Sequence, residues 1–65
     1  MAHDHIFLAR EHVSKGRQIV ARQRALILQI REQRRDPAEA EDLLLRFESS
    51  LHIFEEDLAR LERGR

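Results

Sequence analysis

The stretch Asp36-Pro37-Ala38-Glu39 has the pattern of a helix start. Asp36 is a good N-cap, because its carboxylate can accept a hydrogen bond from a free N–H group of the first turn. Pro37 falls at the first helical position, where its missing N–H costs nothing, and Glu39 completes a capping-box spacing three residues after the cap. Because proline disfavours the helical conformation in the residue before it, a preceding helix has to stop by about Arg35.

Apolar residues recur at spacings of three and four on both sides of this turn. The first stripe comprises Ile6, Ala9, Val13, Gly16, Val20, Gln23, Ile27 and Ile30. The second comprises Ala40, Leu44, Phe47, Leu51, Phe54, Leu58 and Leu61. Such sustained heptads predict two helices, over residues 4–34 and 37–63, with a coiled-coil-like seam. The heptad frame restarts after the turn, so we predict an all-α antiparallel hairpin that forms one domain over residues 1–65.

Charged residues flank the seam at every seventh position. The first helix carries Arg10, Arg17, Arg24 and Arg31, and the second carries Glu41, Glu48, Glu55 and Glu62. In an antiparallel pair these rows face each other. The predicted ion pairs are symmetric about residue 36, which means that the two residues of each pair lie equally far from it along the sequence. The predicted core layers, such as Val20 with Phe54, are symmetric about residue 37. Each exposed pair contributes only ~0–1 kcal/mol, so the rows mainly select orientation and register. Gly16 inside the first helix predicts a close approach of the second.

The apolar stripe is wider than a two-helix seam needs, and it widens on the side away from the Arg/Glu rows. A chain of 65 residues, 7.7 kDa and no cysteine has little core of its own. We therefore expect a homodimer that forms a four-helix bundle. The residues predicted at the oligomer interface are Ile6, Phe7, Leu8, Ile19, Leu26, Leu43 and Ile53.

The predicted core register leaves residues 1–8 overhanging the hairpin. This segment is either a frayed end or a cover for the partner subunit through Ile6, Phe7 and Leu8. Leu28 and Leu45 lie off both seams near the turn, where we expect them to extend the core.

The sequence contains no pattern of a catalytic or cofactor site, and we predict no enzyme and no cofactor. The histidines His3, His5, His12 and His52 lack the i, i+4 spacing that places two metal ligands on one helical face. A polar or interface pair of His12 with Asp57 is favoured over a metal site. The acidic residues of the second helix are best interpreted as a solvated, ion-paired face, and no serine has a base beside it.

The charges sum to zero but are divided unevenly along the chain. Residues 1–35 hold eight basic and three acidic residues, and residues 36–65 hold four basic and nine acidic ones. RNA binding through a basic face of the first helix, with Lys15, Arg22 and Arg35, is therefore an alternative function. The longest apolar runs span three or four residues, whereas a membrane-spanning helix needs ~20, so we expect a cytoplasmic protein with no membrane partner.

Two segments carry a family resemblance: A-R-E-H-V-x-x-G-R-Q-I-V-x-R-Q-R-x-L-I over residues 9–27, and R-x-D-x-x-x-A-E-x-L-L-x-x-F-E-x-S-L over residues 34–51. The chain resembles short uncharacterised helical-hairpin proteins of α-proteobacteria, and the architecture is similar to the small RNA-binding Rop fold. The first resemblance implies a bacterial cytosolic hairpin without a known activity. Arg34-Arg35 stands where that family has glycine before the aspartate, so the turn here is expected to be tighter or more helical.

Together these observations predict a non-enzymatic module for oligomerisation and protein interaction. Its expected partners are a second copy of itself and a protein of unknown identity, with nucleic acid as the less favoured alternative.

Overall fold

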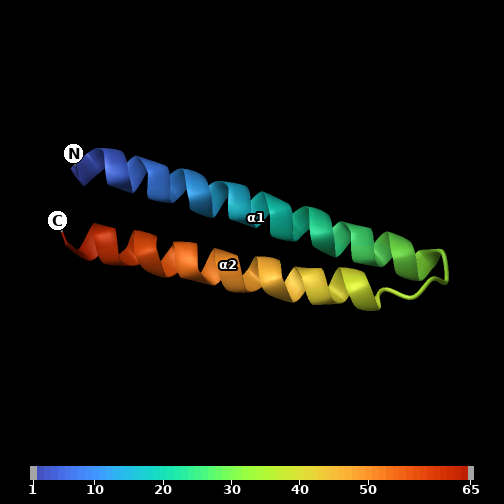
Figure 1. Cartoon of the computed structure of the whole chain (residues 1–65). Coiled ribbons are helices and arrows are strands. Elements are labelled where there is room, and N and C mark those ends of the chain that lie inside the picture. Colours follow the sequence, from blue (N-terminus) through green and yellow to red (C-terminus); the bar gives the residue numbers. More distant parts are fainter. Residues whose placement is uncertain (1, 65) are drawn as a thin grey trace.

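The chain folds into two long antiparallel helices. The computed structural model describes residues 2–64, and the side chains of residues 5–64. Helix α1 (Ala2–Glu32) and helix α2 (Ala38–Arg63) lie side by side along the length of α2 (Figure 1). The described residues contain no strand, so the predicted all-α hairpin is confirmed. The molecule measures 49 × 14 × 13 Å along its principal axes, a rod only two helices wide.

Helix α1 ends in a Schellman motif built without glycine. The N–H of Arg34 donates to the carbonyl of Arg31 at 2.9 Å, and the N–H of Arg35 donates to the carbonyl of Ile30 at 3.0 Å. This pair of bonds requires a left-handed residue at the position that Arg34 occupies. Arg34 adopts it, with φ at 58°. The turn therefore uses the conformation that a glycine would provide, with an arginine in its place.

Helix α2 begins one residue later than the Asp-Pro pattern predicts, because Pro37 and not Asp36 is at the N-cap. The N–H of Ala38, the first helical residue, donates to Oδ1 of Asp36 at 3.0 Å, so this carboxylate bonds the first turn from the position before the N-cap. The carbonyl of Pro37 accepts the first helical bond, from the N–H of Glu41 at 2.8 Å. Within the described residues no hydrogen bond joins Glu39 to Asp36. The predicted capping box is therefore not formed.

The two helices contribute unequally to the core. Buried α1 residues are Ile6, Ala9, Val13, Val20, Gln23 and Ile27, whereas on α2 only Ala40 is buried. The larger core residues of α2 are half-buried: Leu44, Phe47, Leu51, Phe54, Leu58 and Leu61. No described side chain is less than 2% exposed. Large α2 side chains thus cover the small ones of α1 and remain partly open to solvent themselves.

The two helices approach each other closely at Gly16. A Cβ atom added there would lie 3.0 Å from Cδ1 and 3.8 Å from Cα of Leu51. The predicted close approach at this glycine is therefore confirmed. It also fixes the register, because Gly16 and Leu51 are level with each other and symmetric about a point between residues 33 and 34.

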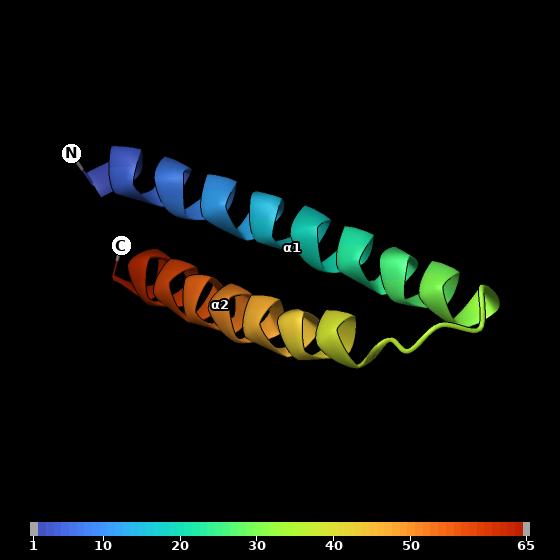
Figure 2. The same ribbon diagram turned by 45° about the vertical axis from the view of Figure 1, so that its right-hand side comes forward.

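The predicted core layers are consequently wrong by one heptad. They were centred on residue 37, which would place Gly16 level with Leu58. Helix α1 continues past the start of α2 at the turn, and the connection runs back along it (Figure 2). A heptad pattern repeats every seven residues, so it does not distinguish two registers that differ by seven.

The predicted overhang of the first eight residues is wrong for the same reason. The described ends of both helices lie at about the same level at the open end of the hairpin (Figure 2). Ile6 is buried, with 4% of its surface exposed, although no second chain is present to cover it. Ile6 is therefore a core residue of the single hairpin, and Met1 lies outside the described residues.

The substitution Arg34→Gly should stabilise the protein. Glycine adopts positive φ at no steric cost, so we expect the free energy of unfolding to rise by about 1 kcal/mol. Urea unfolding followed by circular dichroism at one fixed protein concentration measures this change. Arg35→Gly is the matched control and should give no gain, because Arg35 does not have a positive φ. Equal or lower stability of Arg34→Gly would contradict the left-handed turn.

Substitution of Gly16 should reveal the close helix contact. Gly16→Leu forces the helices apart, and we expect it to cost about 1–3 kcal/mol of stability. Gly16→Ala should change stability by less than about 1 kcal/mol, because better helix propensity is offset by displacement of the Leu51 tip. Ser14→Leu, at an exposed position on the same turn, is the control for the larger side chain. Thermal unfolding of the three variants makes the comparison, and a fully stable Gly16→Leu would refute the contact.

Candidate interaction surface

One side of the hairpin carries a row of four ion pairs between the helices, called the ladder below. The pairs are Arg10–Glu62 at 3.3 Å, Arg17–Glu55 at 3.2 Å, Arg24–Glu48 at 2.7 Å, and Arg31–Glu41. All four predicted pairs are thus formed. The arginine side chains are 56–67% exposed, so each pair contributes only ~0–1 kcal/mol. The ladder therefore favours this register without supplying most of the stability.

The ion pairs of the ladder and the contacts of the core are symmetric about different points of the sequence, and the reason is geometric. Ladder pairs are symmetric about residue 36, whereas Gly16 and Leu51 are symmetric about a point between 33 and 34. Side chains on a helix lean toward its N-terminus, and these leans are opposed in antiparallel helices. An arginine of α1 and a glutamate of α2 therefore meet when their backbones are offset by about five residues.

The side opposite the ladder is apolar. Five large side chains of both helices are exposed there, and we call them the apolar face: Leu8, Ile19, Leu26, Leu43 and Ile53. Their exposed fractions range from 40% to 57%. All five were predicted at an oligomer interface from their heptad positions. The structure places them on one side of the single hairpin, where the rest of the described chain covers them only in part.

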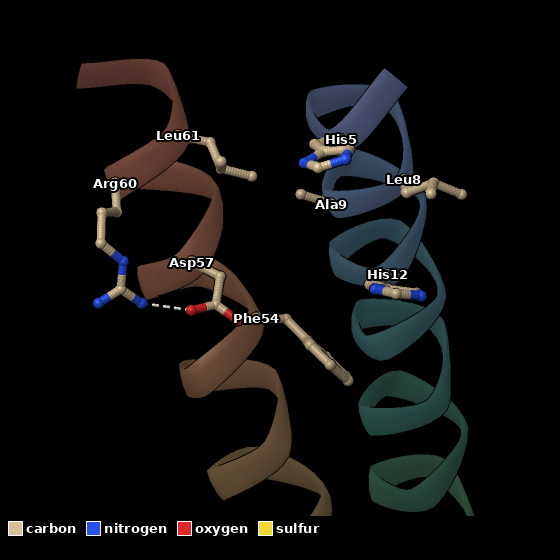
Figure 3. A pocket seen from close by; sticks show the side chains of 8 residues that line it. All are labelled: His5, Leu8, Ala9, His12, Phe54, Asp57, Arg60 and Leu61. Atoms are coloured by element: carbon tan, nitrogen blue, oxygen red, sulfur yellow. Dashed lines mark hydrogen bonds and ion pairs between the residues drawn. The ribbon is translucent and has the colours of Figure 1, made fainter. Parts of the chain in front are cut away.

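A hollow of about 300 Å³ opens at the end of the apolar face that carries the termini of the described helices (Figure 3). The rings of His12 and Phe54 pack with their centroids 5.1 Å apart. The carboxylate of Asp57 accepts a hydrogen bond from Arg60. The predicted pair of His12 with Asp57 is therefore not formed, because each has another partner. Apolar side chains, including Leu8 and Leu61, line the rest of the hollow.

Three exposed apolar residues lie outside this face. Phe7, Leu28 and Leu45 occupy positions on the ladder side and are 60–63% exposed. Leu28 borders a shallow groove near the turn, together with Arg31 and Glu41 of the ladder. The expectation that Leu28 and Leu45 extend the core is wrong, because the helices meet along the heptad seam and these positions are too far around it.

The described histidines do not gather with acids into a metal-binding group. In residues 5–64 no three His, Cys, Asp or Glu side chains lie together in a way that could hold an ion. His52 lies 3.7 Å from Glu56 along α2, on the solvent side. His5 lines the open-end hollow. The side chain of His3 lies outside the described residues.

Gln23 is a buried polar residue whose role the sequence pattern does not show. Its side chain is 8% exposed within the core stripe, and its Nε2 donates to the carbonyl of Ala40 at 2.9 Å. A polar group in a heptad core usually specifies register at some cost in stability. The sequence does show that Gln23 is a polar residue in an apolar stripe. It does not show the bonding partner, because that partner is a backbone carbonyl, which every residue has.

The chain matches no family model, no curated protein and no solved structure. Neither α1 nor α2, as far as the structure describes them, has an apolar stretch long enough to cross a bilayer. The surface chemistry of the hairpin is therefore the basis for any statement about function.

A double-mutant cycle on Arg24 and Glu48 should measure the strength of one ladder pair. We expect a coupling of about 0.2–1 kcal/mol between Arg24→Ala and Glu48→Ala, and a smaller value at high salt because exposed charges are screened. The control cycle combines Arg22→Ala with Glu48→Ala, which do not interact, and should give no coupling. Equal couplings in the two cycles would show that the ladder geometry does not stabilise this register.

Proposed function

We propose that this protein is a non-enzymatic module for helical oligomerisation and protein interaction, and that it forms a homodimeric four-helix bundle. The observation that carries the proposal is the apolar face, which is exposed along one side of the single hairpin. The second copy packs its own apolar face against it.

The half-open core of α2 supports a second layer of helices. Phe47 and Phe54 are only partly covered by the small side chains opposite them on α1. A stripe that includes flanking positions as well as the seam is typical of helices in a bundle. A second hairpin on this side covers the edges of these rings as well as the apolar face.

The size of the face fits a stable dimer. A side of the hairpin measures 49 × 14 Å, which corresponds to a footprint of roughly 700 Å² on each subunit. Two such footprints lie within the range of about 1,200–2,000 Å² that specific protein interfaces bury. Burial of apolar surface at about 25 cal/mol per Å² supplies the driving force, from which the entropic cost of association is subtracted.

The charge pattern favours protein interaction over the nucleic-acid alternative. The arginine row that an RNA would contact is paired with glutamates along the whole ladder. Of the basic residues named for that role, Lys15 and Arg22 flank the apolar face and Arg35 lies in the turn. Phosphate binding rewards clustered, unneutralised positive charge. We therefore do not advance RNA binding as the function.

The exposed pair Leu28 and Leu45 stays outside the proposed dimer interface. Both lie on the ladder side near the turn, and both are more than half exposed. Exposed apolar groups of this kind are where a further protein partner of the bundle would bind. The proposal thus separates a self-association face from a second, smaller contact region.

The solution mass tests the dimer directly. We expect the wild-type chain to sediment as a dimer at micromolar concentration, and Leu26→Lys to shift it to monomer, because a buried unpaired ammonium group is costly. Leu28→Lys is the matched control, since Leu28 is a large exposed apolar residue of the same helix but lies on the ladder side. It should leave the mass unchanged. A wild-type monomer at high micromolar concentration would refute the proposed function.

A further inference from the structure

We infer that the second copy lies face to face with the first and points the same way, with both turns at one end of the bundle. Helix α1 of each subunit then lies over α2 of the other, and all neighbouring helices are antiparallel. This arrangement rests on the proposed dimer and names how the two copies meet. Charges at the rim of the apolar face, and not the apolar residues, distinguish it from the reversed arrangement.

Exposed charges border the apolar face on both helices. The heptad places ten of them at the rim: Glu11, Lys15, Arg22 and Glu32 on α1, and Glu39, Asp42, Arg46, Glu56, Arg60 and Arg63 on α2. Lys15, Arg22 and Glu11 form no ion pair with any described residue of the same chain. A carboxylate oxygen of Glu56 lies 3.7 Å from Nε2 of His52, and Arg60 bonds Asp57 through one of its five N–H groups. The rim therefore retains charge for a partner.

The ladder provides the rule by which charges on antiparallel helices meet. Its pairs are symmetric about residue 36, because opposed leans offset the backbones. A two-fold axis parallel to the helices keeps every residue at its own level, so the same rule holds between the two subunits. Pairs that are symmetric about a point close to residue 36 should therefore form across the interface.

Two opposite-charge pairs satisfy this rule. Lys15 and Glu56 of the partner subunit are symmetric about a point between residues 35 and 36. The same is true of Glu11 and the partner subunit's Arg60. The two-fold axis repeats both pairs, so the rim holds four favourable contacts in all.

This arrangement also brings like charges near each other. Glu32 and the partner subunit's Glu39 satisfy the same rule near the turn and repel each other. The like-charge neighbours Arg22 and Arg46 diverge. Arg22 is level with the partner subunit's Arg46, but each side chain leans toward the N-terminus of its own helix, and these directions are opposed. Arg46 leans toward Asp42, with which it pairs at 3.3 Å. The two guanidinium groups thus point away from each other.

The reversed arrangement brings like charges together. Turned end for end, α1 lies over α1 of the partner and α2 over α2, with the helix midpoints near residues 17 and 50 level with their copies. With the offset that the ladder shows, Lys15 meets the partner subunit's Arg22. Arg46 meets the partner subunit's Arg60. The two-fold axis repeats both contacts, so the reversed dimer holds four repulsive contacts and, between Asp42 and the partner subunit's Arg63, two attractive ones. The proposed arrangement has the opposite balance, with four attractive contacts and the two repulsive contacts of Glu32 with Glu39.

Spin labels at the turn separate the two arrangements, and the chain has no cysteine to interfere. In the proposed dimer, labels on Arg35→Cys lie on adjacent turns, and we expect a distance of about 15–25 Å by electron double resonance, from helix spacings of 8–10 Å plus the label arms. In the reversed dimer they lie at opposite ends of a 49 Å rod. Labels on Gln18→Cys, near the middle of α1, should be close in both arrangements and serve as the control.

The outcomes distinguish this inference from the proposed function. A monomer, with no label distance at either site, overturns both. A dimer in which the Gln18 labels are close but the Arg35 labels are more than about 40 Å apart overturns only the arrangement. Short distances at both sites support it.

Charge reversal at the rim is an independent check. Lys15→Glu should weaken the dimer about tenfold at low salt, because two attractive pairs become repulsive. Adding Glu56→Lys should restore the affinity to within about threefold of the wild type. Lys15→Glu combined with Asp42→Lys, which changes the net charge identically, should not restore it. Equal recovery in both double variants would overturn the pairing of Lys15 with Glu56.

Discussion

The hairpin depends on one packing constraint: small residues on α1 against large residues on α2. Gly16 lets Leu51 approach closely enough that an added Cβ would contact it. Val13 and Val20 on either side of this contact are buried, whereas Phe54 and Phe47 on the other helix remain half open. A narrow stripe of small side chains has too little width to cover aromatic rings. The same contact that brings the helices together therefore leaves the α2 core incomplete.

The lean of side chains along each helix links the core to the charges. The Gly16–Leu51 contact determines which backbone positions of α1 and α2 lie side by side. Two long charged side chains then meet when their backbone positions differ by about five residues from this alignment. On one side this offset produces the ladder from Arg10–Glu62 to Arg31–Glu41. On the other side no described rim charge pairs with the opposite helix of the same hairpin. Arg60, for example, bonds Asp57 within α2.

The sequence predicted what depends on local chemistry and periodicity. The position of the turn to within a residue or so, the two helices and the four ladder pairs all follow from residue type and a seven-residue repeat. The core register does not, because a repeat of seven fits equally well after a shift of seven. What decides between the registers is the left-handed Arg34 and the connection that runs back along α1. A left-handed arginine has no sequence signature, so the overhang of the first residues was predicted wrongly and Ile6 proved to be core.

Apolar area and charge would contribute differently to an association of two hairpins: the area favours association, and the charges select its orientation. Apolar burial scales with area and has no direction, so the apolar face favours both arrangements of two hairpins about equally. Exposed ion pairs are each too weak to hold two chains together, but their sign changes when one chain is reversed. A chain of zero net charge that pairs its arginines and glutamates internally on one side can still select an orientation on the other. In the proposed dimer this selection comes from Glu11, Lys15, Glu56 and Arg60, whose levels along the rod would bring opposite charges together in only one direction.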